Sequence, residues 1–253
     1  HAYLAWDRYR FDNRYCGARC AIFGGPVSTT MMLLACLSLP VIGGMLVVLT
    51  GRWPNIREAV SILTGITLFS LVLQLPTTLP VTVLAEPAPG FQLSLHIEPL
   101  GYVFACLASF LWIVTTIYAI GYMRAHHEQN QTRFYFWFAL AIAATMGIAF
   151  AGDMLTLFVF YEILTLATWP LVTHSQTREA RRSGRIYLGV LLSTSMGLLL
   201  LSTSLIWWLN GTLEFQPGGV FDDTVAASVL AVIYTLFVFG VGKAALMPFH
   251  SWL

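Results

Sequence analysis

Residues 153–172 read DMLTLFVFYEILTLATWPLV, an apolar run that begins with Asp153 and has one further acid, Glu162, near its centre. A run of about 20 residues is long enough for a helix to cross ~30 Å of hydrocarbon at about 1.5 Å per residue. The run is apolar on every side, whereas a membrane barrel strand alternates polar and apolar residues. Backbone groups in lipid must also be paired within their own segment, so the stretch predicts a transmembrane helix.

The composition extends this interpretation to the whole chain. Of the 253 residues, 57% are hydrophobic and 10% are charged, against ~25% charged in an ordinary soluble domain. Apolar runs of spanning length cover approximately residues 27–49, 57–75, 99–121, 134–151, 154–173, 187–209 and 225–247. We therefore expect an all-α, polytopic transmembrane helical bundle of about seven spans, which leaves no room for a soluble catalytic domain.

The two ends of the chain differ from this pattern. Residues 1–25 are basic, aromatic and interrupted by glycine, so we interpret them as an N-terminal extension of uncertain origin and not as a signal peptide. Residues 26–253 form the expected transmembrane domain. The chain lacks an initial methionine and stops at Leu253 inside an apolar run, which predicts the N-terminal part of a longer protein.

Arginine recurs in every second connector. Residues 50–57, 122–133 and 174–186 contain arginines, whereas residues 76–98 and 210–224 contain none. By the positive-inside rule, the connectors with arginine face the cytoplasm. We expect an integral protein of a bacterial inner (plasma) membrane, with the lipid bilayer as its surroundings.

Several classes of function are disfavoured by what the sequence lacks. A net charge of +1 provides no basic surface for nucleic acid. The four cysteines, Cys16, Cys20, Cys36 and Cys106, are too few and too badly placed for a disulfide scaffold or a four-ligand metal site. No nucleotide-binding loop or haem-ligating histidine pair is evident. We therefore expect no cofactor and no bound metal.

Two ionisable residues, Glu162 and Lys243, are predicted to lie well within the spans, where a charge costs ~2.5–3.5 kcal/mol. Glu162 follows Asp153 by nine residues, which places it roughly 14 Å into its span, near the midplane. It is either a protonated acid that bonds a neighbouring helix or a proton-relay group, and Thr165 could bond the carboxyl or hold a water. The acids at span ends, Glu98, Asp153 and Glu179, are expected to be hydrated.

Lys243 is the only lysine, and the other twelve basic residues are arginines. Arginine stays charged at any accessible pH, while a buried lysine can lose and regain its proton, so a titrating site would use lysine. The alternative is a lysine that snorkels to the interface. However, the apolar run continues to Leu253, which is too long for one straight crossing.

Pro248 suggests how this excess length is accommodated. Proline lacks the N–H that a continuing helix requires, so we expect the seventh span to be broken near Pro248. His250 follows Lys243 by seven residues. A lysine, a break and a histidine form a plausible proton path, with a kinked helix and an interfacial histidine as the alternative. The serine and threonine clusters at 193–195 and 202–204 are more typical of close helix packing than of an ion path.

Three stretches together resemble a known family. They are FYEILTLATWPLV with Glu162, GRIYLGVLLSTS after an arginine-bearing connector, and GVGKAALMPFHSWL. They resemble the antiporter-like, proton-conducting membrane subunits shared by respiratory complex I, membrane-bound hydrogenases and Mrp-type sodium/proton antiporters. HIEPLGYVFACLASFLWIVTTIYAIGYM is similar to the third span of that family. The likeness covers about residues 27–253, and TWPLVTH is most similar to the D-type antiporter branch.

The resemblance implies a full-length protein of about 14 helices in two inverted repeats, each with a broken helix. It implies that Glu162 matches the fifth-helix glutamate, Lys243 the seventh-helix lysine, and that His250 lies just beyond the break. The implied function is proton translocation coupled to exchange of a monovalent cation, with other membrane subunits as partners and no catalysis by the chain alone. The alternative is a proton-pumping subunit of a complex I-like NADH:quinone oxidoreductase or a membrane-bound hydrogenase.

Two further interpretations belong to other classes. Seven spans and a lone lysine in the last one are also the outline of a microbial rhodopsin, but the third span, FACLASFLWIVTTIYAIGY, contains no acid that could serve as a counter-ion. A purely structural membrane subunit with vestigial charges is the second.

Overall fold

The computed structural model describes residues 26–76, 79–88, 91–215, 219–221, 225–244 and 247. Within these ranges, six helices are long and apolar enough to cross a membrane. They are α2 (Pro26–Leu49), α3 (Pro54–Gln74), α4 (Pro99–Ala125), α5 (Gln131–Ala149), α6 (Met154–Val172) and the continuous helix Arg178–Asn210. A shorter apolar helix, α9 (Ala227–Gly240), follows. The expected polytopic helical bundle is confirmed, and the chain is an integral membrane protein.

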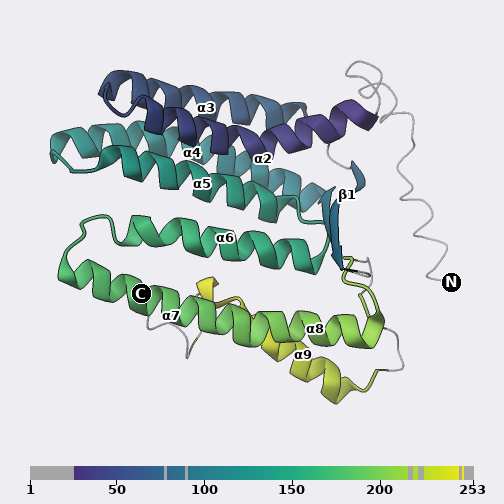
Figure 1. Cartoon of the computed structure of the whole chain (residues 1–253). Coiled ribbons are helices and arrows are strands. Elements are labelled where there is room, and N and C mark those ends of the chain that lie inside the picture. The colour runs from purple at the N-terminus through teal and green to yellow at the C-terminus, as the bar shows by residue number, and fades with distance from the viewer. Residues whose placement is uncertain are drawn as a thin grey trace.

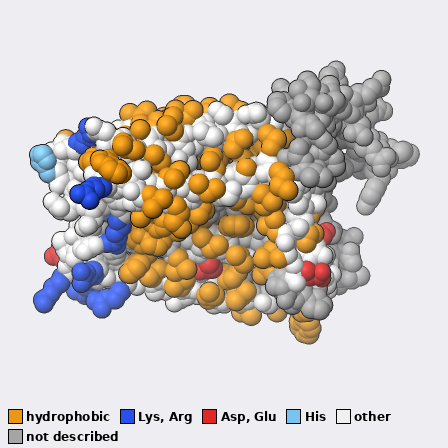
Figure 2. All heavy atoms as spheres, turned by 45° about the horizontal axis from the view of Figure 1, so that its top comes forward, with side chains coloured by type: hydrophobic (Ala, Val, Ile, Leu, Met, Phe, Trp, Pro, Cys, Tyr) orange, Lys and Arg blue, Asp and Glu red, His pale blue; other side chains and the backbone are white. Residues whose placement is uncertain are grey.

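The helices lie side by side, and successive connectors alternate between the two ends of the bundle (Figure 1). The connectors α2–α3, α4–α5 and α6–α7 lie at one end, where Lys and Arg side chains gather in Figure 2. We call this the basic end, and its arginines are Arg52, Arg57, Arg124, Arg133, Arg178, Arg181, Arg182 and Arg185. The alternation of arginine along the sequence therefore corresponds to one end of the folded bundle.

Local sequence explains where several helices begin and end. Pro54 and Pro99 occupy the first positions of α3 and α4, where a missing N–H leaves no hydrogen bond unmade. Thr177 caps α7 (Arg178–Thr194) by accepting a hydrogen bond from the Ala180 N–H at 3.1 Å. Gly211, with φ of 70°, ends α8 (Leu200–Asn210) in the left-handed region that glycine adopts without strain.

A π-helical turn, Ser195–Leu199, joins α7 to α8 within one continuous helix. The polar side chains of this region donate hydrogen bonds to carbonyls of their own helix; these residues are Thr194, Ser195, Ser202, Thr203 and Ser204. All but Ser204 are buried. Each of these hydroxyls therefore has a carbonyl partner within its own helix.

A β-hairpin lies at the end of the bundle opposite the basic end (Figure 1). Strand β1 (Leu79–Ala88) pairs antiparallel with β2 (Phe91–Ile97), with Thr82 opposite Leu95. Residues 76–98 were predicted only as a connector between two spans. The period-2 pattern of FQLSLHI was the available signal, and Leu95 and Ile97 are buried.

Asp153 fastens this hairpin to the start of α6. Its carboxylate accepts hydrogen bonds from Ser94 N at 2.8 Å and Ser94 Oγ at 2.5 Å, and from Thr156 N at 2.6 Å and Thr156 Oγ1 at 2.7 Å. Asp153 is 2% exposed, so the prediction that it is hydrated is wrong. Four protein donors replace water around the charge, and they fix the end of the helix that contains Glu162.

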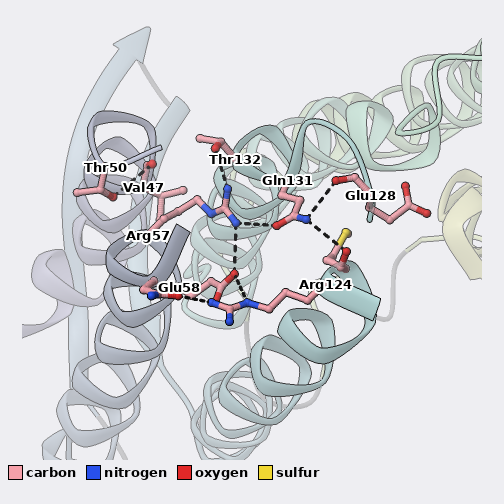
Figure 3. A network of polar contacts seen from close by, with 10 residues as sticks. Val47, Thr50, Arg57, Glu58, Arg124, Glu128, Gln131 and Thr132 are labelled. Carbon is pink, nitrogen blue, oxygen red and sulfur yellow. Dashed lines mark hydrogen bonds and ion pairs between the residues drawn. The ribbon is translucent and has the colours of Figure 1, made fainter. Parts of the chain in front are cut away.

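A second buried polar network joins three helices at the basic end (Figure 3). Glu58 Oε1 accepts from Arg57 Nη2 at 3.3 Å and from Arg124 Nε at 3.2 Å, and Glu58 Oε2 accepts from Arg124 Nη2 at 2.5 Å. Arg57 also donates to Thr132 Oγ1 at 3.2 Å and to Gln131 Oε1 at 2.7 Å. One carboxylate therefore binds α4 to α3, and one guanidinium binds α5 to α3.

This network adds two buried ionisable residues near a helix end to Glu162 and Lys243, which were predicted to lie well within the spans. Arg57 is 5% exposed and Glu58 4% exposed, although both lie within the first turn or two of α3. The last turn of α4, with Arg124, and the first turn of α5, with Gln131 and Thr132, supply the hydrogen-bond partners that cover them. The position of Arg57 and Glu58 near the end of a span does not predict their burial. The residues that cover them are more than 60 positions away in the sequence.

Replacing Glu58 tests whether the network holds the helices together. Glu58→Gln should lower the free energy of unfolding by about 3 kcal/mol or more, because it leaves the buried Arg57 guanidinium without its negative partner. Glu128→Gln is the matched control, since its carboxylate takes no part in the network drawn in Figure 3. Thermal unfolding of both variants in one detergent measures the difference. An unchanged Glu58→Gln midpoint would contradict this role.

Candidate functional site

The helix of the seventh apolar segment ends earlier than the break predicted near Pro248. α9 ends at Gly240, and Gly242–Ala244 form a single 3-10 turn. The α-helix therefore ends before Lys243 and eight residues before Pro248. Pro248 and His250 lie outside the described residues.

Two glycines explain the position of this break. A Cβ at Gly240 would lie 2.7 Å from Leu199 Cα, and a Cβ at Gly242 would collide with the Thr194 hydroxyl. The chain therefore approaches the continuous helix at its π-helical turn more closely than a residue with a side chain allows. Val241 between them has φ −78° and ψ 60°, outside the helical region. π turns are frequent at functional sites.

Lys243 is bound to α6 through one residue, Tyr161. Its Nζ donates to the Tyr161 carbonyl oxygen at 3.0 Å and lies 4.2 Å from the centre of the Tyr161 ring. Its backbone N–H donates to the Tyr161 hydroxyl, also at 3.0 Å. Because Tyr161 lies near the middle of α6, the ammonium is directed into the bundle, which is not the arrangement of a snorkelling lysine.

Glu162, the neighbour of Tyr161, has the opposite environment. It is 8% exposed, and neither carboxyl oxygen has a hydrogen-bond partner among the described residues. The expected bond from Thr165 is not formed, because the Thr165 hydroxyl donates to the Tyr161 carbonyl at 3.0 Å instead. A buried carboxyl group without a partner is costly in either protonation state, and more so when ionised.

The structure brings Glu162 and Lys243 together without pairing them directly. Lys243 Nζ contacts the carbonyl oxygen of Tyr161, the residue before Glu162, yet no ion pair within 4.0 Å joins Lys243 to Glu162. A proton that leaves one of these groups therefore changes the electrostatic environment of the other at short range. Among the described residues, no group of three His, Cys, Asp or Glu side chains is placed to hold a metal ion.

Tyr161 is the site residue that the sequence analysis missed. The available signal was a hydrogen-bonding aromatic residue directly before the midplane acid in FYEIL. Residues adjacent in a helix point about 100° apart, so Tyr161 does not lie on the helix face of Glu162. The contact with Lys243 uses the Tyr161 backbone carbonyl and ring together, which no pattern of side chains encodes.

Removing the Tyr161 ring tests its hold on Lys243. Tyr161→Leu keeps the backbone carbonyl but deletes the ring and the hydroxyl, and a desolvated cation–π contact is worth about 2 kcal/mol. We expect proton transport by the full-length protein to fall by about tenfold or more. Tyr234→Leu, at a residue that is 71% exposed, is the control. Equal transport by the two variants would show that Tyr161 does not position Lys243.

Comparison with known families supports the resemblance inferred from sequence. Residues 151–253 match the family described as "NADH:quinone oxidoreductase/Mrp antiporter, TM". The chain is 26% identical over 177 residues to hydrogenase-4 component B of Escherichia coli (strain K12), which covers 68% of this chain and 26% of that protein. It is 29% identical over 167 residues to NADH-quinone oxidoreductase subunit N of Desulforudis audaxviator (strain MP104C), covering 65% and 33%.

The fold is also similar to a chain in the structure of the Mrp complex from Dietzia sp. DQ12-45-1b. The TM-score is 0.69 at 23% identity, over 89% of this chain and 24% of that chain. The chain spans between 26% and 33% of the length of the two relatives above. The predicted resemblance to the antiporter-like membrane subunits is thus confirmed, and residues 151–253 are the part of the chain that matches the NADH:quinone oxidoreductase/Mrp antiporter family.

Proposed function

We propose that the full-length protein is a proton-translocating membrane subunit that couples proton movement to exchange of a monovalent cation. The observation that supports this most is the site itself. Its only lysine, Lys243, lies at a helix break with its ammonium on the Tyr161 carbonyl, beside Glu162, whose buried carboxyl has no hydrogen-bond partner among the described residues. Glu162, Lys243 and His250 are the proposed proton-translocating residues.

The proposed mechanism is electrostatic. A negative charge on Glu162 favours the ammonium form of Lys243, and its neutralisation weakens the hold of Lys243 on its proton. The released proton then passes beyond the break, towards His250. The 3-10 turn supports this step, because a broken helix at membrane depth provides backbone groups that can hold water along a path. Lysine suits the role because arginine does not release its proton.

A second candidate is a proton-pumping subunit of a redox-driven complex. The similarity to hydrogenase-4 component B and to an NADH-quinone oxidoreductase subunit N favours it. Both candidates use the same Glu162–Lys243 chemistry and differ in the source of energy. Sodium or potassium dependence of proton movement in the isolated complex distinguishes them. Exchange that needs the cation and no electron donor supports the antiporter.

The partners follow from the same reasoning. Either an ion gradient drives exchange directly or neighbouring subunits transmit redox energy through contacts with these helices. We propose that the protein functions within a hetero-oligomeric complex of the bacterial inner membrane, with protons and monovalent cations as its substrates. The chain is not catalytic by itself under this proposal.

Substitution of the lone lysine is the first test. Lys243→Ala should abolish proton-coupled transport by the full-length protein in its complex, while Lys243→Arg should restore little of it, since a guanidinium keeps its proton. Dye-monitored proton uptake into proteoliposomes measures both. A fully active Lys243→Arg variant would mean that the charge is required but its titration is not.

Substitution of the acid is the second test. Glu162→Gln should lower the rate, and the alkaline limb of its pH profile should move to lower pH, because the ammonium loses a nearby negative charge that favours it. Glu179→Gln is the control, since Glu179 is exposed in the first turn of α7. A pH profile that coincides with the wild-type profile would show that Glu162 and Lys243 do not communicate.

A further inference from the structure

A run of hydroxyl groups follows the contact between α6 and α7. The Thr165 hydroxyl donates to the Tyr161 carbonyl at 3.0 Å, the same oxygen that accepts from Lys243 Nζ. One turn further along α6, Thr168 Oγ1 lies 2.7 Å from the hydroxyl of Tyr187 on α7. Thr168 Oγ1 also lies 3.1 Å from the Thr165 carbonyl oxygen. Three hydroxyls thus extend away from the lysine.

The run extends towards the basic end. Thr168 is six residues closer to that end than Glu162, which is roughly 9 Å along the helix axis. Tyr187 follows the last arginine of the α6–α7 region, Arg185, by two residues. The Thr168–Tyr187 pair therefore lies between the arginines at the surface of the bundle and the Glu162–Lys243 site.

The two helices approach each other closely about one turn from this pair. A Cβ at Gly184 would collide with the Thr173 methyl group and would lie 3.0 Å from Trp169 Nε1. Tyr187 is 7% exposed. The absence of a side chain at Gly184 allows α6 and α7 to pack closely. A phenylalanine ring at position 187 would fill the same space as the tyrosine ring. The hydroxyl of Tyr187 is thus a polar group buried where packing alone does not require one.

The geometry of Thr168 permits the direction of donation to reverse. Its hydroxyl lies 2.8 Å from the Leu164 carbonyl oxygen and 2.7 Å from Tyr187 OH, and either hydroxyl of the pair could be the donor. When Thr168 donates to Leu164, Tyr187 donates to Thr168; when Thr168 turns, it donates to Tyr187. A relay needs this reversal, because each hydroxyl accepts a proton on its oxygen and releases its own, and so ends unchanged.

We propose that Tyr187, with Thr168 and Thr165, passes protons between the basic end and the Glu162–Lys243 site, with water bridging the gaps between the hydroxyls. This inference rests on the proposed function and adds the residues that conduct protons to Lys243. The α6–α7 contact, and not the lipid-facing surface, is the route.

Tyr187→Phe in the full-length protein within its complex is the central variant. Proton uptake into proteoliposomes should fall by about tenfold or more, at the low side of what positioned proton-transfer groups contribute. The ratio of rates in H₂O and D₂O should rise, because proton transfer becomes limiting. Tyr234→Phe removes the same hydroxyl from a 71% exposed site on α9 and should change neither quantity.

Thr168→Val is the second variant and decides the matter if Tyr187→Phe does not assemble. It should produce the same change in isotope ratio, and the double variant should be no slower than the slower single variant, because both residues act in one step. Wild-type rates, or additive losses at an unchanged isotope ratio as a packing defect would give, overturn the relay.

Glu162→Gln in the same assay separates this inference from the proposed function. If Glu162→Gln is inactive while Tyr187→Phe and Thr168→Val transport at the wild-type rate, the relay is wrong and the proposed function stands. If Glu162→Gln transports at the wild-type rate, the proposed function fails and the relay, which rests on it, fails with it.

Discussion

A buried carboxyl group without a hydrogen-bond partner is the constraint on which the rest of this bundle depends. Glu162 lies near the middle of α6, and an unpaired charge at that depth costs several kcal/mol. The neighbouring segment compensates by ending its helix at Gly240, so that Lys243 reaches the Tyr161 carbonyl. The two glycines, the π-helical turn and the ring of Tyr161 all serve to bring one ammonium close to this carboxyl group.

Three buried acids in the same chain show how surroundings decide what a carboxyl group does. Glu58 accepts hydrogen bonds from two guanidiniums, and Asp153 accepts four from Ser94 and Thr156. Both contribute to structure, because their carboxyl oxygens accept hydrogen bonds from guanidinium, N–H or O–H donors. Glu162 has none among the described residues. Among these three acids, Glu162 is therefore the one whose carboxyl group belongs to no hydrogen-bond network of the described residues.

The helical spans and the depth of Glu162 could be predicted because both depend on length and apolarity, which are properties of a continuous stretch. The burial of Asp153 and the end of α9 at Gly240 could not. Each depends on a surface supplied by a distant segment, the hairpin for Asp153 and the π-helical turn for Gly240. Pro248 was the obvious helix breaker in the sequence, but two glycines in close contact with another helix end the α-helix earlier.

The most direct test of the account is the protonation of Lys243 itself. Because Lys243 is the only lysine among these 253 residues, the chain labelled with ¹⁵N at the lysine side chain contains one labelled amine. In the complete complex, the difference spectrum against Lys243→Arg isolates the same signal. The account predicts that this nitrogen converts between ammonium and amine within the pH range in which the complex transports protons. An ammonium signal that persists unchanged across that whole range would contradict it.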